Sequence, residues 1–171
     1  RQCPKIGGGM LHHSLQGIVG AEVPGRPLDA TIVVPTLNER SNIDLLLERI
    51  GAAATDLNWE LIFVDDGSTD GTAEHIEQIA QKDHRIRLIR RFGRRGLASA
   101  VVEGAYASTA PVVAVMDADL QHDETILPAL VEPLLAGQAD IAVGTRYADG
   151  GSTAGWDEKR LRISRAATRL A

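Results

Sequence analysis

The stretch VVAVMDADLQHD, residues 112–123, leads an apolar run into two aspartates, Asp117 and Asp119. Carboxylates are rarely buried without a partner, which here would be a metal ion, a helix N-terminus or a phosphate reached through a metal. In an extended segment residues i and i+2 point the same way, so both carboxylates can reach one hard cation. Gln121 offers a further oxygen, and this donor set suits Mg²⁺ or Mn²⁺. The alternative is that the aspartates only cap the following helix.

A second acidic pair, Asp65 and Asp66, ends the apolar segment WELIFV. Aspartate before Gly and Ser is common in turns, which would explain the pair without any ligand. The functional alternative is a carboxylate that accepts hydrogen bonds from the N–H edge of a nucleobase. Asn38 and Glu39, in the loop after Pro35, are placed to hold the same nucleoside.

Arginines crowd into the segment RIRLIRRFGRR, residues 85–95. For most of them we favour a solvated strand end and loop, and the alternative is a basic flap near phosphates or anionic lipid head groups. Arg146 differs, because it directly follows an apolar segment at the edge where the aspartates are expected. We interpret His122 as a polar loop residue and leave it out of the predicted chemistry.

Strand-like and helix-like segments alternate from residue 29 onward. Strands are predicted at residues 30–35, 59–64, 85–90, 111–116 and 140–147. Helices are predicted at residues 38–50, 72–80, 96–108 and 124–137. We expect the strand at 111–116 to be buried on both faces, Thr72 to cap its helix and Pro133 to shorten or kink the last helix.

This alternation predicts an α/β fold with a mainly parallel sheet and helices on both faces. Ligands of such sheets bind outside the carboxyl ends of the strands. The loops PTLNER, DDGSTDG, DADLQHD and GTRY should therefore open onto one edge. Residues 1–28 are rich in Gly and Pro and predict a flexible leader, which leaves residues 29–171 as the domain. The chain begins without Met and ends in RISRAATRLA, so we expect a piece of a longer protein.

Composition excludes several other classes of protein. The 171 residues suffice for one domain. A net charge of −5 argues against nucleic-acid binding, which needs a basic field. Cys3 is the only cysteine, which excludes a disulfide framework or a Cys-rich metal site within one chain. The sequence has no apolar stretch of about 20 residues, so it predicts no membrane span.

Five motifs occur in series: IVVPTLNERSNI, FVDDGSTDGT, GLASAVVEGA, VMDADLQHD and VGTRYADGG. Their order and spacing resemble those of the inverting family 2 glycosyltransferases, which have the Rossmann-like GT-A fold. The resemblance covers residues 30–171. DADLQH with GTRY and the following Trp, Arg and Ser is most similar to the polyprenol-phosphate sugar transferases, the dolichol-phosphate mannose synthases among them.

The resemblance implies a nucleotide-sugar donor held at the first two loops and at the D-x-D aspartates. The residues that it assigns to the donor are Pro35, Leu37, Glu39, Val64, Asp66, Asp117, Ala118 and Asp119. It also implies Mg²⁺ or Mn²⁺ as cofactor, held by Asp117, Asp119 and Gln121. Relatives often have an aromatic residue where Leu37 stands.

The implied acceptor is a polyprenyl or dolichyl phosphate, bound by Arg146, Arg160 and Ser164. A phosphate is already an anion at neutral pH, so the two arginines need only position it through charge-assisted hydrogen bonds. A direct in-line displacement would invert the anomeric centre. The expected reaction is transfer of mannose from GDP-mannose to the lipid phosphate, at a membrane surface on its cytoplasmic side.

Four alternatives stay open. Within the superfamily, the donor could be UDP-glucose or another sugar nucleotide, and the acceptor a glycan or lipid hydroxyl, because DGSTDGT occurs throughout it. FVDD also resembles the acidic pair of a response-regulator receiver, but Lys5, Lys82 and Lys159 do not follow predicted strands. VMDADLQ begins like the D-x-D of aspartyl phosphatases, whose motif continues into Thr or Val where this chain has Gln121.

Overall fold

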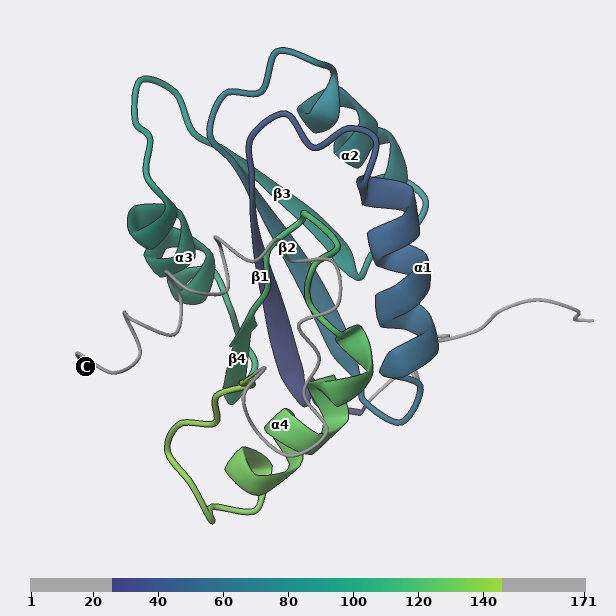
Figure 1. Ribbon diagram of the computed structural model, residues 1–171, viewed down its shortest axis with the longest axis vertical. Helices are drawn as coiled ribbons and strands as arrows, with labels where there is room; N and C mark the ends of the chain where they lie inside the picture. Colours follow the sequence, from purple (N-terminus) through teal and green to yellow (C-terminus); the bar gives the residue numbers. More distant parts are fainter. Residues whose placement is uncertain (1–25, 146–171) are drawn as a thin grey trace, which may run out of the picture.

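The computed structural model describes residues 26–145 and contains one parallel sheet (Figure 1). Its strands, in the spatial order β3-β2-β1-β4, are β1 (Ala30–Thr36), β2 (Trp59–Asp65), β3 (Ile86–Arg90) and β4 (Val112–Val115). The helices are α1 (Ile43–Ala53), α2 (Thr72–Ala80), α3 (Leu97–Tyr106) and α4 (Leu127–Leu135), with a 3₁₀ turn, η1 (Glu124–Ile126), before α4. The predicted α/β class with a parallel sheet is confirmed.

The core lies on both faces of the two central strands, β1 and β2. Side chains on one face of these strands pack with α1, α2 and the start of α4, and the opposite face is covered by α3 (Figure 1). The first group includes Ile32, Val34, Leu61 and Phe63, and the second Val33, Ile62 and Val64. Every residue of β2 is buried, as expected for a strand that has a partner on each side and helices above and below.

Helix α3 approaches the sheet closely at Gly104. A Cβ built there would lie 2.4 Å from Val33 Cγ1 and 3.1 Å from Val64 Cγ2. Any side chain at this position would overlap the valine methyl groups, so only glycine allows the helix backbone to come this close to the sheet. The close approach fixes α3, and with it the loop that connects β3 to α3 at residues 91–96.

The expectation that the fourth strand is buried on both faces is wrong. Val113 and Val115 are 37% and 50% exposed. Pairing with β1 places them on the α3 side of the sheet, but α3 packs on β1 and β2. No other element of residues 26–145 covers that face of β4, so its apolar side chains stay accessible to solvent.

The expectation of a fifth strand at 140–147 is also wrong over its described part. Residues 140–145 form no strand, and Ile141 and Val143 are 80% and 76% exposed. A β-branched run suits a pleated surface, but a strand also needs a main-chain partner. Within the described residues β4 pairs only with β1, so residues 140–145 have no strand with which they form main-chain hydrogen bonds.

Several helix ends differ from the prediction. Helix α1 begins at Ile43 instead of residue 38, because the preceding residues form a loop that contacts the loop after β2. The expectation that Thr72 caps α2 is wrong, because Gly71 occupies the N-cap position. The Thr72 hydroxyl instead accepts a hydrogen bond from the Glu39 N–H in the loop after β1. Pro133 lies inside the last turn of α4, which ends at Leu135, two residues before the predicted end at residue 137.

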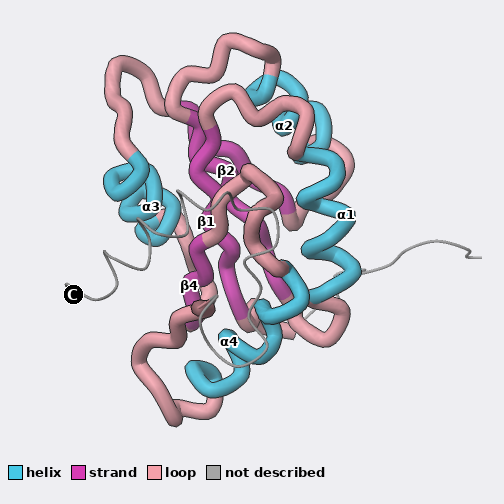
Figure 2. The backbone as a smooth tube through the Cα atoms, in the orientation of Figure 1, coloured by secondary structure: helices cyan, strands magenta, loops and turns pink. Residues whose placement is uncertain are grey.

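The loops after β1, β2 and β3 gather at one edge of the sheet, the upper edge in Figure 2, which we call the carboxyl edge. The chain leaves β1 towards α1 on one face, whereas α3 connects β3 to β4 across the other face. The sheet therefore has its topological switch point between β1 and β4, where ligands bind in open α/β sheets.

Candidate functional site

The loops after β1 and β2 are hydrogen-bonded into one rim of the carboxyl edge. Asn38 has φ +58°, a left-handed conformation that asparagine tolerates, and its N–H donates to Ser68 Oγ at 2.8 Å. Its side-chain oxygen accepts the Thr69 N–H at 2.8 Å. Glu39 N–H donates to Thr72 Oγ1 at 3.0 Å. These cross-links hold the two predicted nucleoside loops against each other.

The residues assigned to the donor on this rim differ in what they can offer. Leu37 is 43% exposed at the carboxyl edge. Glu39 is partly buried, and its carboxylate accepts a hydrogen bond from the Asn42 side chain at 2.7 Å. Pro35 and Val64 are paired in the sheet, and Val64 is fully buried under α3, so its side chain is not available to a ligand.

Asp65 is a turn-forming residue. It is 1% exposed, and one of its oxygens accepts the N–H groups of Gly67 and Ser68 at 3.1 and 3.0 Å. The other accepts the hydroxyls of Ser68 and Thr36. Turn formation therefore explains Asp65 without any ligand, as the first of the two alternatives for the acidic pair predicted.

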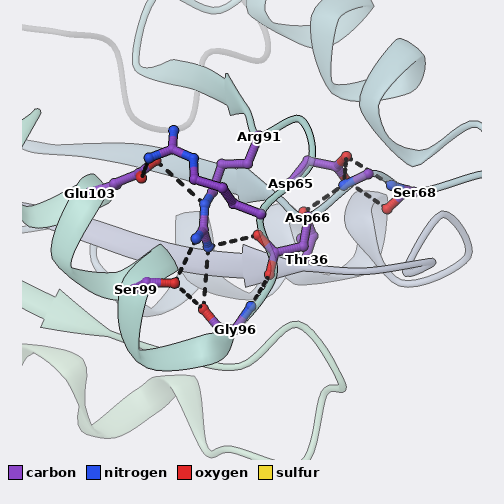
Figure 3. Close-up of polar contacts among 10 residues, drawn as sticks. Thr36, Asp65, Asp66, Ser68, Arg91, Gly96, Ser99 and Glu103 are labelled. Carbon is purple, nitrogen blue, oxygen red and sulfur yellow. Dashed lines mark hydrogen bonds and ion pairs between the residues drawn. The ribbon is translucent and has the colours of Figure 1, made fainter.

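Asp66 instead faces a buried arginine (Figure 3). Arg91 Nη1 donates to Asp66 Oδ1 at 2.7 Å, and the Gly96 N–H donates to Asp66 Oδ2 at 2.8 Å. Arg91 also donates to the Gly96 carbonyl at 3.2 Å and to Ser99 Oγ at 2.5 Å. Its Nε lies 3.4 Å from Glu103 Oε2. The loop between β3 and α3 is thus folded onto Asp66.

The interpretation of the arginine-rich segment as solvated fails for Arg91, whose side chain is 1% exposed. It holds for Arg90 and Arg94, which form partly exposed ion pairs with acidic residues of α2 and α3. The register of β2 against β3 would have indicated the partner of Arg91, but the sequence alone does not show it. Asp65 pairs with Arg90 at the ends of β2 and β3, so the residues that directly follow these strands, Asp66 and Arg91, lie side by side.

The loop after β4 carries the D-x-D aspartates on its accessible side. Ala118 is 3% exposed, whereas Asp117 is partly buried and Asp119 is exposed. Asp119 Oδ1 accepts the Gln121 N–H at 3.0 Å, and Asp117 Oδ2 lies 3.7 Å from His122 Nε2. His122 therefore packs against Asp117 within this loop, although we had interpreted it from the sequence as a polar loop residue without a role.

The explanation of this pair as helix caps is wrong. Asp123 performs that role, accepting the Thr125 N–H at 3.0 Å at the start of η1. A hydrogen bond from the Thr125 hydroxyl lowers the pKa of Asp123 below its usual value. Asp117 and Asp119 are therefore not needed to begin the helix.

The donor chemistry of this loop fits a hard divalent cation. Asp117 and Asp119 supply carboxylate oxygens and Gln121 an amide oxygen, while residues 26–145 contain no cluster of three or more His, Cys, Asp or Glu that could hold a metal alone. Mg²⁺-type ions are commonly held by one or two carboxylates, with waters and substrate phosphates completing the shell. The loop suits a metal that arrives with a phosphate ligand.

The predicted acceptor residues, Arg146, Arg160 and Ser164, lie outside the described residues 26–145. Within that part, the structure brings the β1 and β2 loops together and ties Arg91 to Asp66. Because Val115 pairs with Val33 and Met116 N–H donates to the Val33 carbonyl at 3.1 Å, the D-x-D loop continues beside the end of β1. The acidic loop therefore lies at the switch point.

A glycosyltransferase is the class that this sheet order and acidic edge fit. The model of the family described as glycosyl transferase family 2 matches residues 31–170. The chain belongs to this family.

Two similar relatives carry the same name. The dolichol-phosphate mannosyltransferase of Pyrococcus furiosus is 40% identical over 140 residues, which cover 82% of this chain and 39% of the relative. That of Saccharomyces cerevisiae is 37% identical over 148 residues, covering 84% of this chain and 55% of the relative. The chain thus spans about half the length of these relatives or less.

A solved structure supports the same fold. Glucosyl-3-phosphoglycerate synthase from Mycobacterium tuberculosis, in complex with Mn²⁺, UDP and glucosyl-3-phosphoglycerate, is 29% identical with a TM-score of 0.50. The match covers 68% of this chain and 42% of that one. The predicted GT-A type fold is confirmed.

Proposed function

We propose that the chain is the nucleotide-sugar-binding part of an inverting glycosyltransferase that transfers mannose from GDP-mannose to a polyprenyl or dolichyl phosphate. The observation that best supports this proposal is the position of the exposed D-x-D loop beside the end of β1. The loop after β1 is in turn hydrogen-bonded to the segment after β2. This edge offers carboxylates for a metal and hydrogen-bond acceptors for a nucleoside. The names of relatives at 37–40% identity support the sugar and the acceptor.

The donor's nucleoside would bind at the rim after β1 and β2. Leu37 offers an exposed apolar contact, and Glu39 and Asp66 offer carboxylates. Pro35 and Val64 shape the floor of this rim from within the sheet. UDP-glucose is the second candidate donor, because the similar synthase structure contains UDP.

Asp117 and Asp119, assisted by Gln121, would hold Mg²⁺ or Mn²⁺, with the buried Ala118 placing the two carboxylates on the accessible side. When bound, the metal neutralises charge on the departing nucleoside diphosphate. The Mn²⁺ in the similar synthase structure supports this assignment. His122, close to Asp117, would help to orient that carboxylate.

The acceptor phosphate would be held by Arg146, Arg160 and Ser164. Two guanidinium groups position a phosphate through charge-assisted hydrogen bonds, and the phosphate then needs no general base. A polyprenyl acceptor requires a membrane surface, which we place on the cytoplasmic side. No helix among residues 26–145 is long and apolar enough to cross a bilayer.

The test is transfer of radiolabelled sugar from GDP-mannose or UDP-glucose to a short polyprenyl phosphate. We expect transfer from GDP-mannose, lost in Arg146→Lys and in Arg160→Ala, because a lysine cannot reproduce the planar fork of an arginine. Arg85→Lys is the matched control, since Arg85 pairs with Asp83 at the opposite edge of the sheet and should transfer normally. Wild-type rates in both variants would show that Arg146 and Arg160 do not hold the acceptor phosphate, and no transfer by the wild type from either donor would contradict the proposed acceptor.

A further inference from the structure

Arg91 is the most completely enclosed arginine of residues 26–145. Its residue exposure is 2%, yet it lies at the carboxyl edge, immediately after β3. Its guanidinium faces Asp66, the Gly96 carbonyl, Ser99 and Glu103 (Figure 3). A buried charge needs such partners, and removing one of them leaves the other uncompensated. The chain therefore maintains a costly arrangement beside the rim proposed to hold the nucleoside.

The contacts of Arg91 and Gly96 determine how Asp66 can meet a ligand. Each carboxylate oxygen accepts one hydrogen bond from the protein, from Arg91 Nη1 at 2.7 Å and from Gly96 N–H at 2.8 Å. An ionised carboxylate has about four acceptor sites, so roughly half stay free. The side chain of Asp66 is 11% exposed, so ligand access is confined to a narrow part of it.

We propose that Arg91 is a positioning residue that sets base preference, by holding Asp66 in one orientation as an acceptor-only group. This inference rests on the proposed function, in which Asp66 contacts the base of the donor. A fixed acceptor matches the N1–H and amino group of guanine or the N3–H of uracil. Adenine and cytosine present an unprotonated ring nitrogen at that position, and two acceptors repel. A site that hydrogen-bonds one ligand rejects an analogue that leaves its polar group unpaired.

The same guanidinium also positions the loop between β3 and α3. Gly96 has φ +135°, and its N–H and carbonyl are both engaged, by Asp66 and Arg91 respectively. Ser99 joins the first turn of α3 to Arg91 Nη2. A lysine has one compact ammonium group and cannot reach Asp66, Gly96 and Ser99 in one plane. Arg91→Lys should thus keep the charge but release the orientation of Asp66.

The test is calorimetric binding of GDP, UDP, ADP and CDP, each with Mn²⁺, to the wild type, Arg91→Lys and Asp66→Asn. We expect the wild type to bind GDP or UDP at least about tenfold more tightly than ADP or CDP. Arg91→Lys should remove most of that ratio by weakening the preferred diphosphate, with ADP and CDP within about twofold of wild type. Arg90→Lys is the matched control, because Arg90 pairs with Glu74 and Glu77 on α2 and should keep the wild-type ratio.

Asp66→Asn separates failure of this inference from failure of the proposed function. If Asp66→Asn loses the ratio and Arg91→Lys keeps it, Arg91 has no positioning role, although Asp66 still reads the base. An equal loss for all four diphosphates in Arg91→Lys would also overturn the inference, since a purely structural residue acts on every ligand alike. If Asp66→Asn keeps the ratio, Asp66 is not the base contact. The inference about Arg91 then fails, together with the part of the proposed function that assigns Asp66 to the base.

A milder variant keeps the inference testable if Arg91→Lys does not fold. Ser99→Ala removes one hydrogen-bond partner of Arg91 Nη2 and leaves the pair with Asp66 in place. We expect it to reduce the ratio by about threefold, a loss smaller than that of a full hydrogen bond to a charged group. An unchanged ratio in a folded Ser99→Ala protein, with Arg91→Lys unfolded, would overturn the inference.

Discussion

The two acidic pairs of the carboxyl edge look alike in sequence but have opposite environments. Asp65 and Asp66 are 1% and 9% exposed, and protein donors engage both oxygens of each carboxylate. The side chain of Asp117 is 48% exposed, and Asp119 is exposed and accepts a hydrogen bond from the Gln121 N–H. The fold satisfies Asp65 and leaves Asp66 only part of its acceptor capacity, whereas Asp117 and Asp119 retain most of theirs for an external ligand.

The position of each strand in the sheet explains the difference. β2 has strands on both sides, so the carboxylates at its end are surrounded by neighbouring loops and must find donors there. β4 is paired on one side only within residues 26–145, and its loop faces solvent. A carboxylate in water needs no protein donor, so Asp117 and Asp119 can bind a cation without disrupting the fold.

The largest effect that this comparison predicts is on activity, at the exposed pair. Asp117→Asn or Asp119→Asn should reduce sugar transfer at least about a hundredfold, because the charge stabilisation supplied by a metal is worth several kcal/mol. Denaturant midpoints should stay at the wild-type value. Asp123→Asn is the control, since Asp123 caps η1 and is not assigned to the metal. A normal rate in both metal-site variants would place the cation elsewhere.

The buried pair should respond in stability. Asp65→Ala leaves the N–H groups of Gly67 and Ser68 and the Thr36 hydroxyl without their acceptor, which should lower the free energy of unfolding by about 2–3 kcal/mol. Urea denaturation measures it. A change below about 0.5 kcal/mol, the range of ordinary surface substitutions, would mean that Asp65 is not a structural acceptor.

A backbone substitution sharpens the comparison on the Arg91 side. Gly96→Ala places a side chain at φ +135°, and such strain costs about 1–3 kcal/mol. The matched control is Gly51→Ala in α1, where no atom lies within 4 Å of the new methyl group and the helix should gain up to about 1 kcal/mol. Equal stabilities for the two variants would show that the loop adopts another conformation.

The smallest expected effect is a pH dependence of the rim. A hydrogen bond from the Thr72 hydroxyl, with backbone N–H donors from Arg40 and Thr72, lowers the pKa of Asp70 below its ordinary value. Because the folded-state pKa is the lower one, the stabilisation is present above the pKa of an ordinary aspartate and is lost as the pH falls through the folded-state pKa. The melting temperature of the wild type should fall slightly more than that of Asp70→Asn between pH 5 and pH 3. Parallel curves would contradict this role.

Much of the fold was predictable because β1, β2 and α1 carry strong local patterns. The apolar runs at 30–35 and 59–64 lie within β1 and β2, and the stripe of Ile43, Leu46 and Ile50 is buried in α1. The failures were at β4 and at residues 140–145. Hydrophobic pattern reports a preference for burial, but tertiary packing decides whether a cover or a partner strand is present.

The sequence predicted which loops carry the site residues, but not which side chains contact one another. The D-x-D aspartates lie on the accessible loop expected of them, and the Asp65 alternative of turn formation proved correct. Arg91 was missed because its partner, Asp66, is 25 residues away and only strand register brings them together. His122 was considered but set aside, because the sequence does not show that the turn at Leu120, with φ +59°, returns the chain towards Asp117.

The central claim is that the exposed pair holds a metal that joins the nucleotide to this edge. Calorimetric titration of GDP with and without Mn²⁺, for the wild type and Asp117→Asn, tests it most directly. We expect Mn²⁺ to strengthen GDP binding at least about tenfold in the wild type and not in Asp117→Asn, because the variant loses a charged ligand of the cation. Equal GDP affinity in Mn²⁺ and in chelator for the wild type would contradict the account.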